Sequence, residues 1–234
     1  MSSNVQQSIK TNSSNARNNI LAKLKKQVEG SDYDKLPIEN SYQYPALTHV
    51  EQVNQLVTLL EANHAEVIKL NQHEIPNIVS QLLKQRGISS LLMGSNNACS
   101  EFDLDSKMDA SITVNKFDFD IHASQEIKNK LFDNTPASIT NSHCSIAATG
   151  SIVLWPTVDE PRSLSLVPPL HFVIVDAKKI HQDFASLINA QQWQGKLPTN
   201  IVLVSGPSKT ADIQQTLAYG AHGPKELIVL LLNS

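Results

Sequence analysis

The sequence predicts an α/β fold: an open, mostly parallel sheet with helices on both faces, preceded by a helical extension at the N-terminus. Two runs, Ile201–Val204 and Leu227–Leu232, contain only apolar side chains. Strands of this kind are buried on both faces, as they are in parallel sheets covered by helices. From Thr48 onward, strand and helix patterns alternate along the chain, which is typical of α/β domains. A chain of 234 residues is long enough to bury a substantial core.

The first part of the chain is expected to lie outside this domain. Met1–Asn15 is rich in Ser, Asn and Gln, a composition that predicts a loose tail. Arg17–Val28 carries apolar residues at helical spacing and predicts an amphipathic helix. Its lysines, Lys23, Lys25 and Lys26, either face water or form a docking surface for an acidic partner.

A proline-containing linker is expected over Gly30–Pro45. We therefore predict two parts, residues 1–45 as a flexible tail, helix and linker, and residues 46–234 as a single α/β domain. Within that domain, Thr48 and Glu51 have the spacing of a capping box at a helix start. The predicted helices are Thr48–Ala62, Ile75–Arg86, Ser124–Asp133 and Lys178–Ala190, and the predicted strands are Glu66–Leu70, Ile88–Met93, Lys116–Ile121, two within Ala137–Trp155, and His171–Asp176.

The stretch from Ile201 to Leu232 is expected to form a right-handed β-α-β unit. The first apolar strand is followed by a break at Ser205–Thr210, a predicted helix over Ala211–Tyr219 and the second apolar strand. A helix N-terminus presents free backbone N–H groups and partial positive charge, so it suits an anion. In open α/β sheets, ligands bind beyond the carboxyl ends of the strands. The break before this helix is therefore a candidate anion site.

Side chains in the break have the chemistry that an anion site needs. Gly206 permits close approach of the backbone, Ser208 and Thr210 supply hydroxyls, and Lys209 supplies a positive charge. The alternative is that Ser208 or Thr210 only caps the helix. The spacing is not that of a Walker phosphate-binding loop.

Five short motifs in this chain are unusual in composition. They are ARNNIL at 16–21, AATGSIVL at 147–154, EPRSLSLVP at 160–168, SGPSKTADI at 205–213 and GAHGPKEL at 220–227. Together they resemble the LutC/YkgG family, the single-domain LUD proteins of bacterial lactate utilisation. The resemblance is strong from about Ala147 to the end of the chain and weak in its middle.

The resemblance implies a fold like that of the NagB/RpiA/CoA-transferase group and a part in the oxidation of L-lactate to pyruvate. It also implies partner subunits that carry iron–sulfur clusters, with no cofactor in this chain. The two cysteines, Cys99 and Cys144, are too few and too far apart to hold a cluster alone. In related sequences the position of Ala148 is commonly acidic, so no catalytic residue is assigned from the resemblance.

Three loops of small residues follow predicted strands, at Gly94–Asn97, Thr149–Ser151 and Ser205–Ser208. If those strands are parallel, the loops meet at one edge of the sheet, where Arg162 and Lys209 add positive charge. Such a set suits a hydroxy- or oxo-acid, a phosphate or the pyrophosphate of a nucleotide. The candidate ligand-binding residues are Thr149, Gly150, Ser151, Arg162, Ser205, Gly206, Pro207, Ser208, Lys209, Thr210, His222 and Gly223.

Several polar side chains have two interpretations. Arg162 either grips a carboxylate or phosphate or pairs with Glu160 or Asp159 to hold its own loop. His171 and His222 are either general acid–base groups or structural residues.

An acidic cluster lies in the middle of the chain. Asp103, Asp105 and Asp109 lack the spacing of a calcium loop and are interpreted as solvated carboxylates. His122 has no partner four residues on and is interpreted as a surface histidine. No metal site is predicted.

The composition excludes several classes of partner. A net charge of −3 and a pI of about 6.2 give no general attraction to nucleic acid or to anionic membranes. No apolar run is long enough to span a bilayer, and the polar N-terminus lacks a signal-peptide core. Two cysteines fit a reducing cytoplasm, where we expect the protein.

Two functions remain open at this point. The first is a non-redox subunit or accessory factor of lactate oxidation that works with iron–sulfur partners and binds a small anion. The second is a stand-alone isomerase, CoA-transferase or cyclo-ligase-like enzyme that acts on a phosphorylated or carboxylate metabolite. The missing cofactor motifs and Ala148 favour the first function, and whether the isolated chain is an enzyme stays open.

Overall fold

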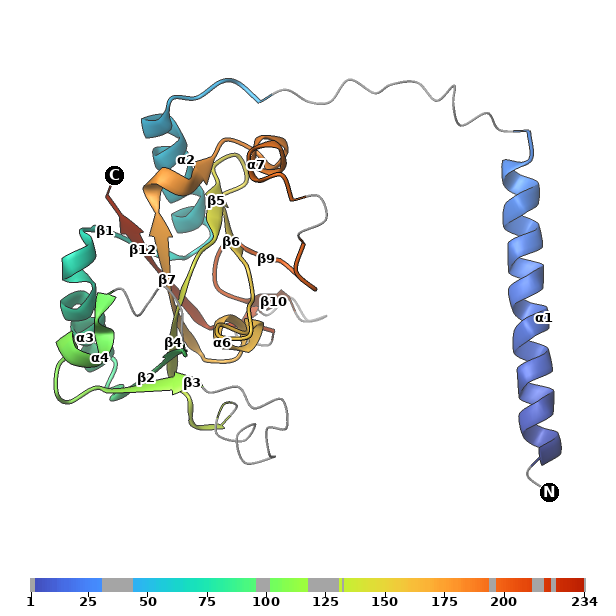
Figure 1. Cartoon of the computed structure of the whole chain (residues 1–234), viewed down its shortest axis with the longest axis horizontal. Coiled ribbons are helices and arrows are strands. Elements are labelled where there is room, and N and C mark those ends of the chain that lie inside the picture. Colours follow the sequence, from blue (N-terminus) through green and yellow to red (C-terminus); the bar gives the residue numbers. More distant parts are fainter. Residues whose placement is uncertain are drawn as a thin grey trace. The chain divides into compact units, whose positions relative to one another are not determined.

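The computed structural model describes residues 3–30, 44–95, 102–117, 131, 133–193, 197–211, 217–219 and 222–233. The chain divides into two units, residues 1–43 and residues 44–234. The described element of the first unit is α1 (Ser3–Val28), a single helix (Figure 1). The helix expected at Arg17–Val28 is therefore confirmed, whereas the loose tail is wrong from Ser3 onward. No proline or glycine interrupts Ser3–Val28, so the helix can extend toward the N-terminus.

The larger unit is built on a six-stranded sheet in the order β1-β12-β7-β4-β2-β3 (Figure 1). All neighbouring strands in it are parallel, which confirms the predicted fold class. The strands are β1 (Glu66–Leu70), β2 (Ser90–Gly94), β3 (Thr113–Phe117), β4 (Ala137–Asn141), β7 (Leu170–Asp176) and β12 (Glu226–Leu232).

Alternate residues of β12, an interior strand of this sheet, belong to two different hydrophobic cores. Ile228 and Leu230 pack on one face with α3 (Ile75–Gln85) and α4 (Leu104–Lys107). Val229 and Leu231 pack on the other face with α2 (His49–Ala62). Because both faces are covered, the run Leu227–Leu232 has to be apolar, as its sequence predicts.

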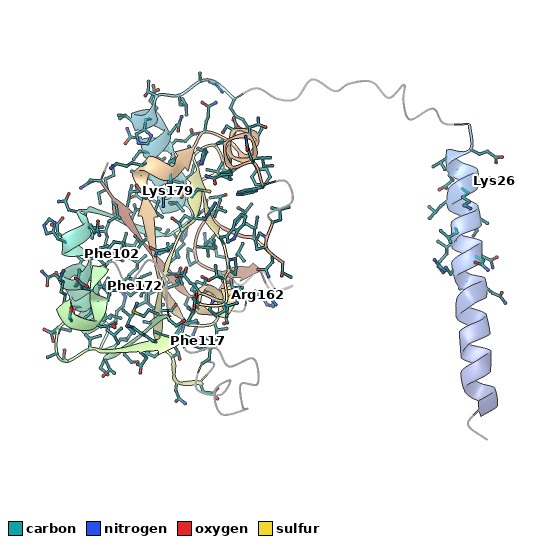
Figure 2. The ribbon with its side chains drawn as sticks, in the orientation of Figure 1. Lys26, Phe102, Phe117, Arg162, Phe172 and Lys179 are labelled. Carbon is teal, nitrogen blue, oxygen red and sulfur yellow. The ribbon has the colours of Figure 1, made fainter. Side chains whose placement is uncertain are left out.

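A second, four-stranded sheet shares the α2 face of the main sheet. Its order is β8-β5-β6-β9, and Ile152 and Leu154 pack beside Leu56 of α2. The fully buried side chain of Phe172, in β7 of the main sheet, lies in the core that α3 covers (Figure 2). The remaining elements are β5 (Cys144–Ile146), β6 (Ser151–Leu154), β8 (Ile180–His181), β9 (Val202–Val204), a hairpin of β10 (Lys209–Ala211) and β11 (Leu217–Tyr219), helices α6 (Arg162–Leu166) and α7 (Phe184–Gln191), and 3-10 turns at Gln72–Glu74 and Ala177–Lys179.

The predicted β-α-β unit at the C-terminal end is wrong. β9 lies in the second sheet, antiparallel to β6, and Leu203 in it is 50% exposed. β10 and β11 form an antiparallel pair where a helix was expected over Ala211–Tyr219. An isolated helix as short as that is marginal, so strand pairing with a neighbour overrides a weak helical pattern.

Other predicted elements differ in their boundaries. Helix α7 begins at Phe184 with Asp183 as its N-cap, because the residues before it form a 3-10 turn and then β8, which pairs with β5. Ala137–Trp155 holds three strands rather than two. The predicted strand Lys116–Ile121 overlaps β3 at its first residues. Its remainder, most of the predicted helix Ser124–Asp133, and most of the linker lie outside the described residues.

The start of α2 confirms the predicted capping box. Thr48 Oγ1 accepts a hydrogen bond from the backbone N–H of Glu51, and the Glu51 carboxylate accepts one from the backbone N–H of Thr48. Helix α3 likewise ends as expected, just before Gly87, whose φ is +67°. Among the described residues, no helix is both long and apolar enough to cross a bilayer.

His171 is a fully buried residue of β7. Its Nε2 lies 2.8 Å from Thr140 Oγ1 on the neighbouring strand β4. Burial lowers the pKa of His171 to about 3, so the imidazole is neutral in the folded protein. A ligand in solvent does not reach this side chain, which supports the structural interpretation of His171.

The variant Thr48→Ala should lower the free energy of unfolding by about 1 kcal/mol, because it removes the hydroxyl acceptor of the capping box. Urea unfolding followed by circular dichroism measures this loss. Thr58→Ala is the matched control, since the Thr58 hydroxyl donates only to Asn54 O within the same helix. A loss in the control as large as in Thr48→Ala would contradict a capping role.

Stability should fall as the pH drops from about 6.5 toward about 3, because the unfolded chain takes up a proton at His171 and the folded chain does not. The loss from this residue is at most about 1.4 kcal/mol per pH unit. Urea unfolding at pH 7 and pH 5 should show a smaller pH dependence in His171→Gln than in the parent. An imidazole NMR signal of His171 that titrates near pH 6.5 in the folded protein would contradict the prediction.

Candidate functional site

The main sheet has a topological switch point between β2 and β4. After β2 the chain passes to β3 on one side, and after β4 it passes to β7 on the other. In open α/β sheets this is the place where ligands bind, in the crevice beyond the carboxyl ends of the two strands. The carboxyl ends here are Gly94 of β2 and Asn141 of β4.

Two carboxylates lie at this edge, supplied by the loop that precedes α6. Asp159 accepts a hydrogen bond from Ser95, with 2.9 Å between Ser95 Oγ and Asp159 Oδ1. The backbone N–H of Ser95 also donates to Asp159 O at 3.1 Å. Glu160 Oε1 accepts a hydrogen bond from the backbone N–H of Asn141 at 3.1 Å. The loop is therefore fastened to the ends of both strands that flank the switch point.

Two buried polar atoms near this edge have no hydrogen-bond partner among the described residues. They are Asn141 Nδ2 at the end of β4 and Ser163 Oγ in the first turn of α6. Buried polar groups normally find partners, so unsatisfied ones indicate a place where a ligand or water donates or accepts. The carboxyl edge therefore carries both fixed carboxylates and unsatisfied polar atoms.

Arg162 is the first residue of α6 and has an exposed side chain (Figure 2). Helix α6 is fastened to the sheet because Ser138 Oγ of β4 donates to Leu164 O at 2.6 Å. On its inner side, Arg162 borders a space of only about 10 Å³ beside Trp155. That is about enough for one water molecule, so a ligand would reach the guanidinium from its exposed side.

The C-terminal candidate residues lie at the opposite, amino edge of the sheet. The backbone N–H of Ser208 donates to Pro224 O at 2.8 Å, just before β12 begins. Lys209 Nζ lies 3.3 Å from Nδ1 of His64, just before β1 begins. A Cβ on Gly206 would stand 2.5 Å from Asn63 O, which explains the glycine there.

The other members of this C-terminal group pack around Ser208. Its hydroxyl accepts a hydrogen bond from the backbone N–H of His222, and Gly223 lies against its Cβ. Pro207 is buried, and Thr210 is a strand residue of β10 paired with Ala218. Of the residues expected to form a helix after this break, Ala211 and Leu217–Tyr219 are strand residues instead.

The small-residue turn before β6 joins this C-terminal group. Ser151 Oγ lies 2.9 Å from Thr149 Oγ1 and 3.0 Å from Ser205 Oγ. Gly150 has a φ of +60°, and a side chain on it would collide with Leu59 of α2. Two of the three predicted loops therefore meet. Ser95, from the first predicted loop, is instead hydrogen-bonded to Asp159 in the loop before α6.

Metal-binding and thiol chemistry find little support in the described part of the chain. There, no group of three or more His, Cys, Asp or Glu side chains has the geometry to hold a metal ion. Burial raises the pKa of the Cys144 thiol to about 12, so it is not a thiolate ligand. Cys99 and His122 lie outside the described residues.

The acidic cluster is accounted for by ion pairs. Asp103, Asp105 and Asp109 pair with Lys107, Lys116 and Lys84, respectively, which supports their interpretation as solvated carboxylates. Hydrogen bonds from Lys84 and Ser111 hold the pKa of Asp109 well below its usual range.

Sequence reasoning did not identify Asn141, Asp159 and Glu160 as one group. The sequence carried only a weak signal, because β4 itself contains Ser138 and Thr140, so Asn141 does not stand out at its end. The pairing of β4 with β2, which brings the ends of these two strands together, is a tertiary property. The loop carboxylates were assigned only as pairing partners for Arg162.

Comparisons with known proteins agree with this fold and with the sequence motifs. The LUD domain family model matches residues 53–232. An uncharacterized protein from Neisseria meningitidis serogroup B is 32% identical over 93% of each chain. Lactate utilization protein C from Oceanobacillus iheyensis is 25% identical over 88% of this chain and 89% of its own, and that from Macrococcus caseolyticus is 26% identical over 94% of each.

A solved structure has the same fold. It is the crystal structure of a DUF162 family protein from Deinococcus radiodurans, with a TM-score of 0.58 and 18% sequence identity. The match covers 80% of this chain and 100% of that one. With the family model matching most of the α/β unit, this chain belongs to the LUD domain family.

Proposed function

We propose that this chain acts in L-lactate utilisation as a non-redox component that binds a small carboxylate anion and works with iron–sulfur partners. The observation that carries this proposal is the similarity to proteins named Lactate utilization protein C, which extends over about nine-tenths of the chain in two relatives. The family match over residues 53–232 supports it. No step of redox chemistry is assigned to a residue of this chain.

The ligand site that we propose is the carboxyl edge at the β2–β4 switch point. The planar guanidinium of Arg162 suits a carboxylate, which it can bind with two parallel hydrogen bonds. Asp159 and Glu160 are acceptors that suit the hydroxyl of a hydroxy-acid. The proposed site does not include Lys209, whose Nζ lies 3.3 Å from Nδ1 of His64, just before β1 begins.

The variant Arg162→Ala should weaken the binding of L-lactate and pyruvate by about tenfold or more, because it removes a charge-assisted hydrogen bond. Lys209→Ala is the matched control, since it removes the same charge from the opposite edge and should leave binding unchanged. Isothermal titration calorimetry of the purified full-length chain measures both. If neither acid binds the parent, or if only Lys209→Ala weakens binding, the site is wrongly placed.

The proposed partners are iron–sulfur subunits, and α1 is the surface that we assign to them. Ser3–Val28 contains five basic residues and no acidic one. One stripe is apolar and exposed, with Ile20 at 59%, Leu24 at 52% and Val28 at 45%. Such a helix fits a groove that is apolar at its centre and acidic at its rim. The like charges of two such helices disfavour pairing with a second copy.

Iron–sulfur proteins should co-purify with the tagged full-length chain from its native host, and the double variant Lys23→Glu/Lys26→Glu should lose them. Lys178→Glu/Lys179→Glu is the control, since it makes the same charge change on exposed residues of the α/β unit. Mass spectrometry and the visible absorption of the clusters identify what is retained.

Two outcomes would count against this part of the proposal. If no iron–sulfur protein accompanies the parent, the partner assignment is wrong. If both double variants keep the partner equally well, α1 is not the docking surface. Turnover of a carboxylate or phosphorylated metabolite by the isolated chain would favour the alternative, a stand-alone enzyme.

A further inference from the structure

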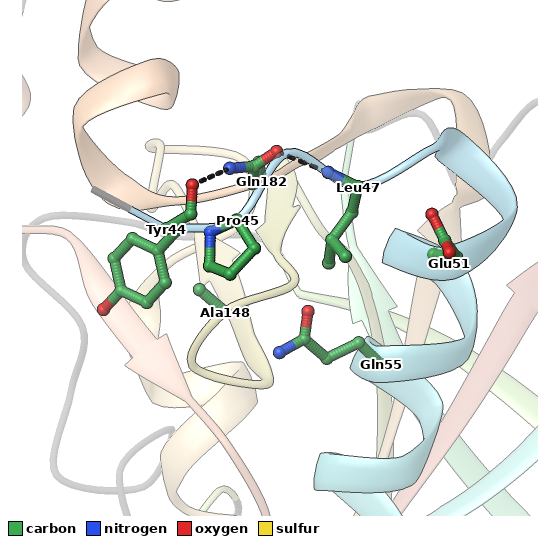
Figure 3. A pocket seen from close by; sticks show the side chains of 7 residues that line it. All are labelled: Tyr44, Pro45, Leu47, Glu51, Gln55, Ala148 and Gln182. Carbon is green, nitrogen blue, oxygen red and sulfur yellow. Dashed lines mark hydrogen bonds between the residues drawn. The ribbon is translucent and has the colours of Figure 1, made fainter.

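A cavity of about 210 Å³ lies between the first half of α2 and the turn that joins β5 to β6 (Figure 3). It is separate from the carboxyl-edge site, because neither Arg162 nor Glu160 lines it. The lining residues are Tyr44, Pro45, Leu47, Glu51, Gln55, Ala148 and Gln182.

Gln182 holds two walls of this cavity in place. Its side-chain Oε1 accepts a hydrogen bond from the backbone N–H of Leu47 at 3.1 Å, and its Nε2 donates to Tyr44 O at 3.3 Å. Its backbone carbonyl accepts a hydrogen bond from Ala148 N at 2.9 Å. One residue thus fastens the Tyr44–Leu47 segment and the turn at Ala148 on either side of the same space (Figure 3). The cavity is therefore a built feature of the fold rather than a gap between loose loops.

The size of the cavity suits a single small ring. An apolar cavity of about 150 Å³ is large enough for benzene. The tyrosine ring, the proline ring, Leu47 and the Ala148 methyl provide apolar walls, so a ring would be partly desolvated by contact with them.

The polar groups of the cavity select for a hydrogen-bond donor. Gln55 Oε1 is buried and has no hydrogen-bond partner among the described residues. In Figure 3 the Gln55 side chain extends from α2 toward Ala148, across the cavity. A buried acceptor without a donor is unfavourable, so a ligand O–H or N–H at this oxygen would be stabilising.

The charge of the lining disfavours an anion. Glu51 supplies a carboxylate, and none of the seven lining residues is cationic. Hydrogen bonds from the side chain and backbone of Thr48 lower the pKa of Glu51, which keeps it ionised. The Glu51 carboxylate would therefore repel lactate, pyruvate and phosphate from this cavity.

We propose that this cavity is a second binding site, for a small uncharged ring compound that carries an O–H or N–H donor. Gln55 accepts the donor, and Tyr44, Pro45, Leu47 and Ala148 contact the ring. The site does not depend on lactate binding at Arg162, and its ligand class is different.

Calorimetry of the full-length chain with phenol as the probe tests this proposal. Phenol should bind, whereas anisole, which lacks the donor, and benzoate, which is anionic, should each bind about tenfold more weakly or worse. Gln55→Leu should weaken phenol binding by about the same factor, because it removes the acceptor and keeps most of the bulk. Asn54→Leu is the matched control on the next residue of α2, which does not line the cavity, and it should bind phenol like the parent.

A second variant keeps the test independent of Gln55. Ala148→Leu should fill the cavity and abolish phenol binding while it leaves lactate binding unchanged, and thermal unfolding confirms that the variant is folded. The proposal is overturned if the parent does not bind phenol at millimolar concentrations. It is also overturned if anisole or benzoate binds as tightly as phenol, or if folded Ala148→Leu and Gln55→Leu both bind phenol like the parent.

Discussion

The pairing of β7 with β12 is the constraint on which the rest of this structure depends. Seven consecutive residues of each strand are in parallel register, from Leu170 and Glu226 to Asp176 and Leu232. Nearly all of these side chains are buried, alternately on the two faces of the sheet. Both faces therefore need a complete covering layer. Helices α3 and α4 supply one layer, and α2 and the second sheet supply the other.

The second sheet decides where the polar loops of the chain lie. It occupies the α2 face, so the segment after β9 passes to the amino ends of β1 and β12 instead of forming a helix on the main sheet. The loop that contains Asp159 and Glu160 is instead fastened to the carboxyl ends of β2 and β4. Arg162 therefore follows a loop fastened to the carboxyl ends of β2 and β4, whereas Lys209 lies beside His64, just before β1 begins.

The features that carry the three proposals lie in separate parts of the chain and differ in chemistry. Arg162 offers positive charge beside two fixed carboxylates at a sheet edge. The cavity beside Ala148 offers apolar walls, an unsatisfied acceptor and a negative charge. Helix α1 offers an apolar stripe with basic residues and no acid. Each of the three features therefore suits a different class of ligand.

Local sequence signals determined the elements whose stability is local or whose burial is complete. Thr48 and Glu51 specify the start of α2 through contacts three residues apart, and the apolar run Leu227–Leu232 specifies a strand buried on both faces. The family resemblance of the motifs from Ala147 onward was equally visible in the sequence and agrees with the family match. Only the tertiary structure decided that β9 joins the second sheet, that Lys209–Ala211 pairs with Leu217–Tyr219, and that β4 pairs with β2. The physical reason is that strand order and sheet membership depend on contacts between residues far apart in the chain, which no short-range pattern encodes.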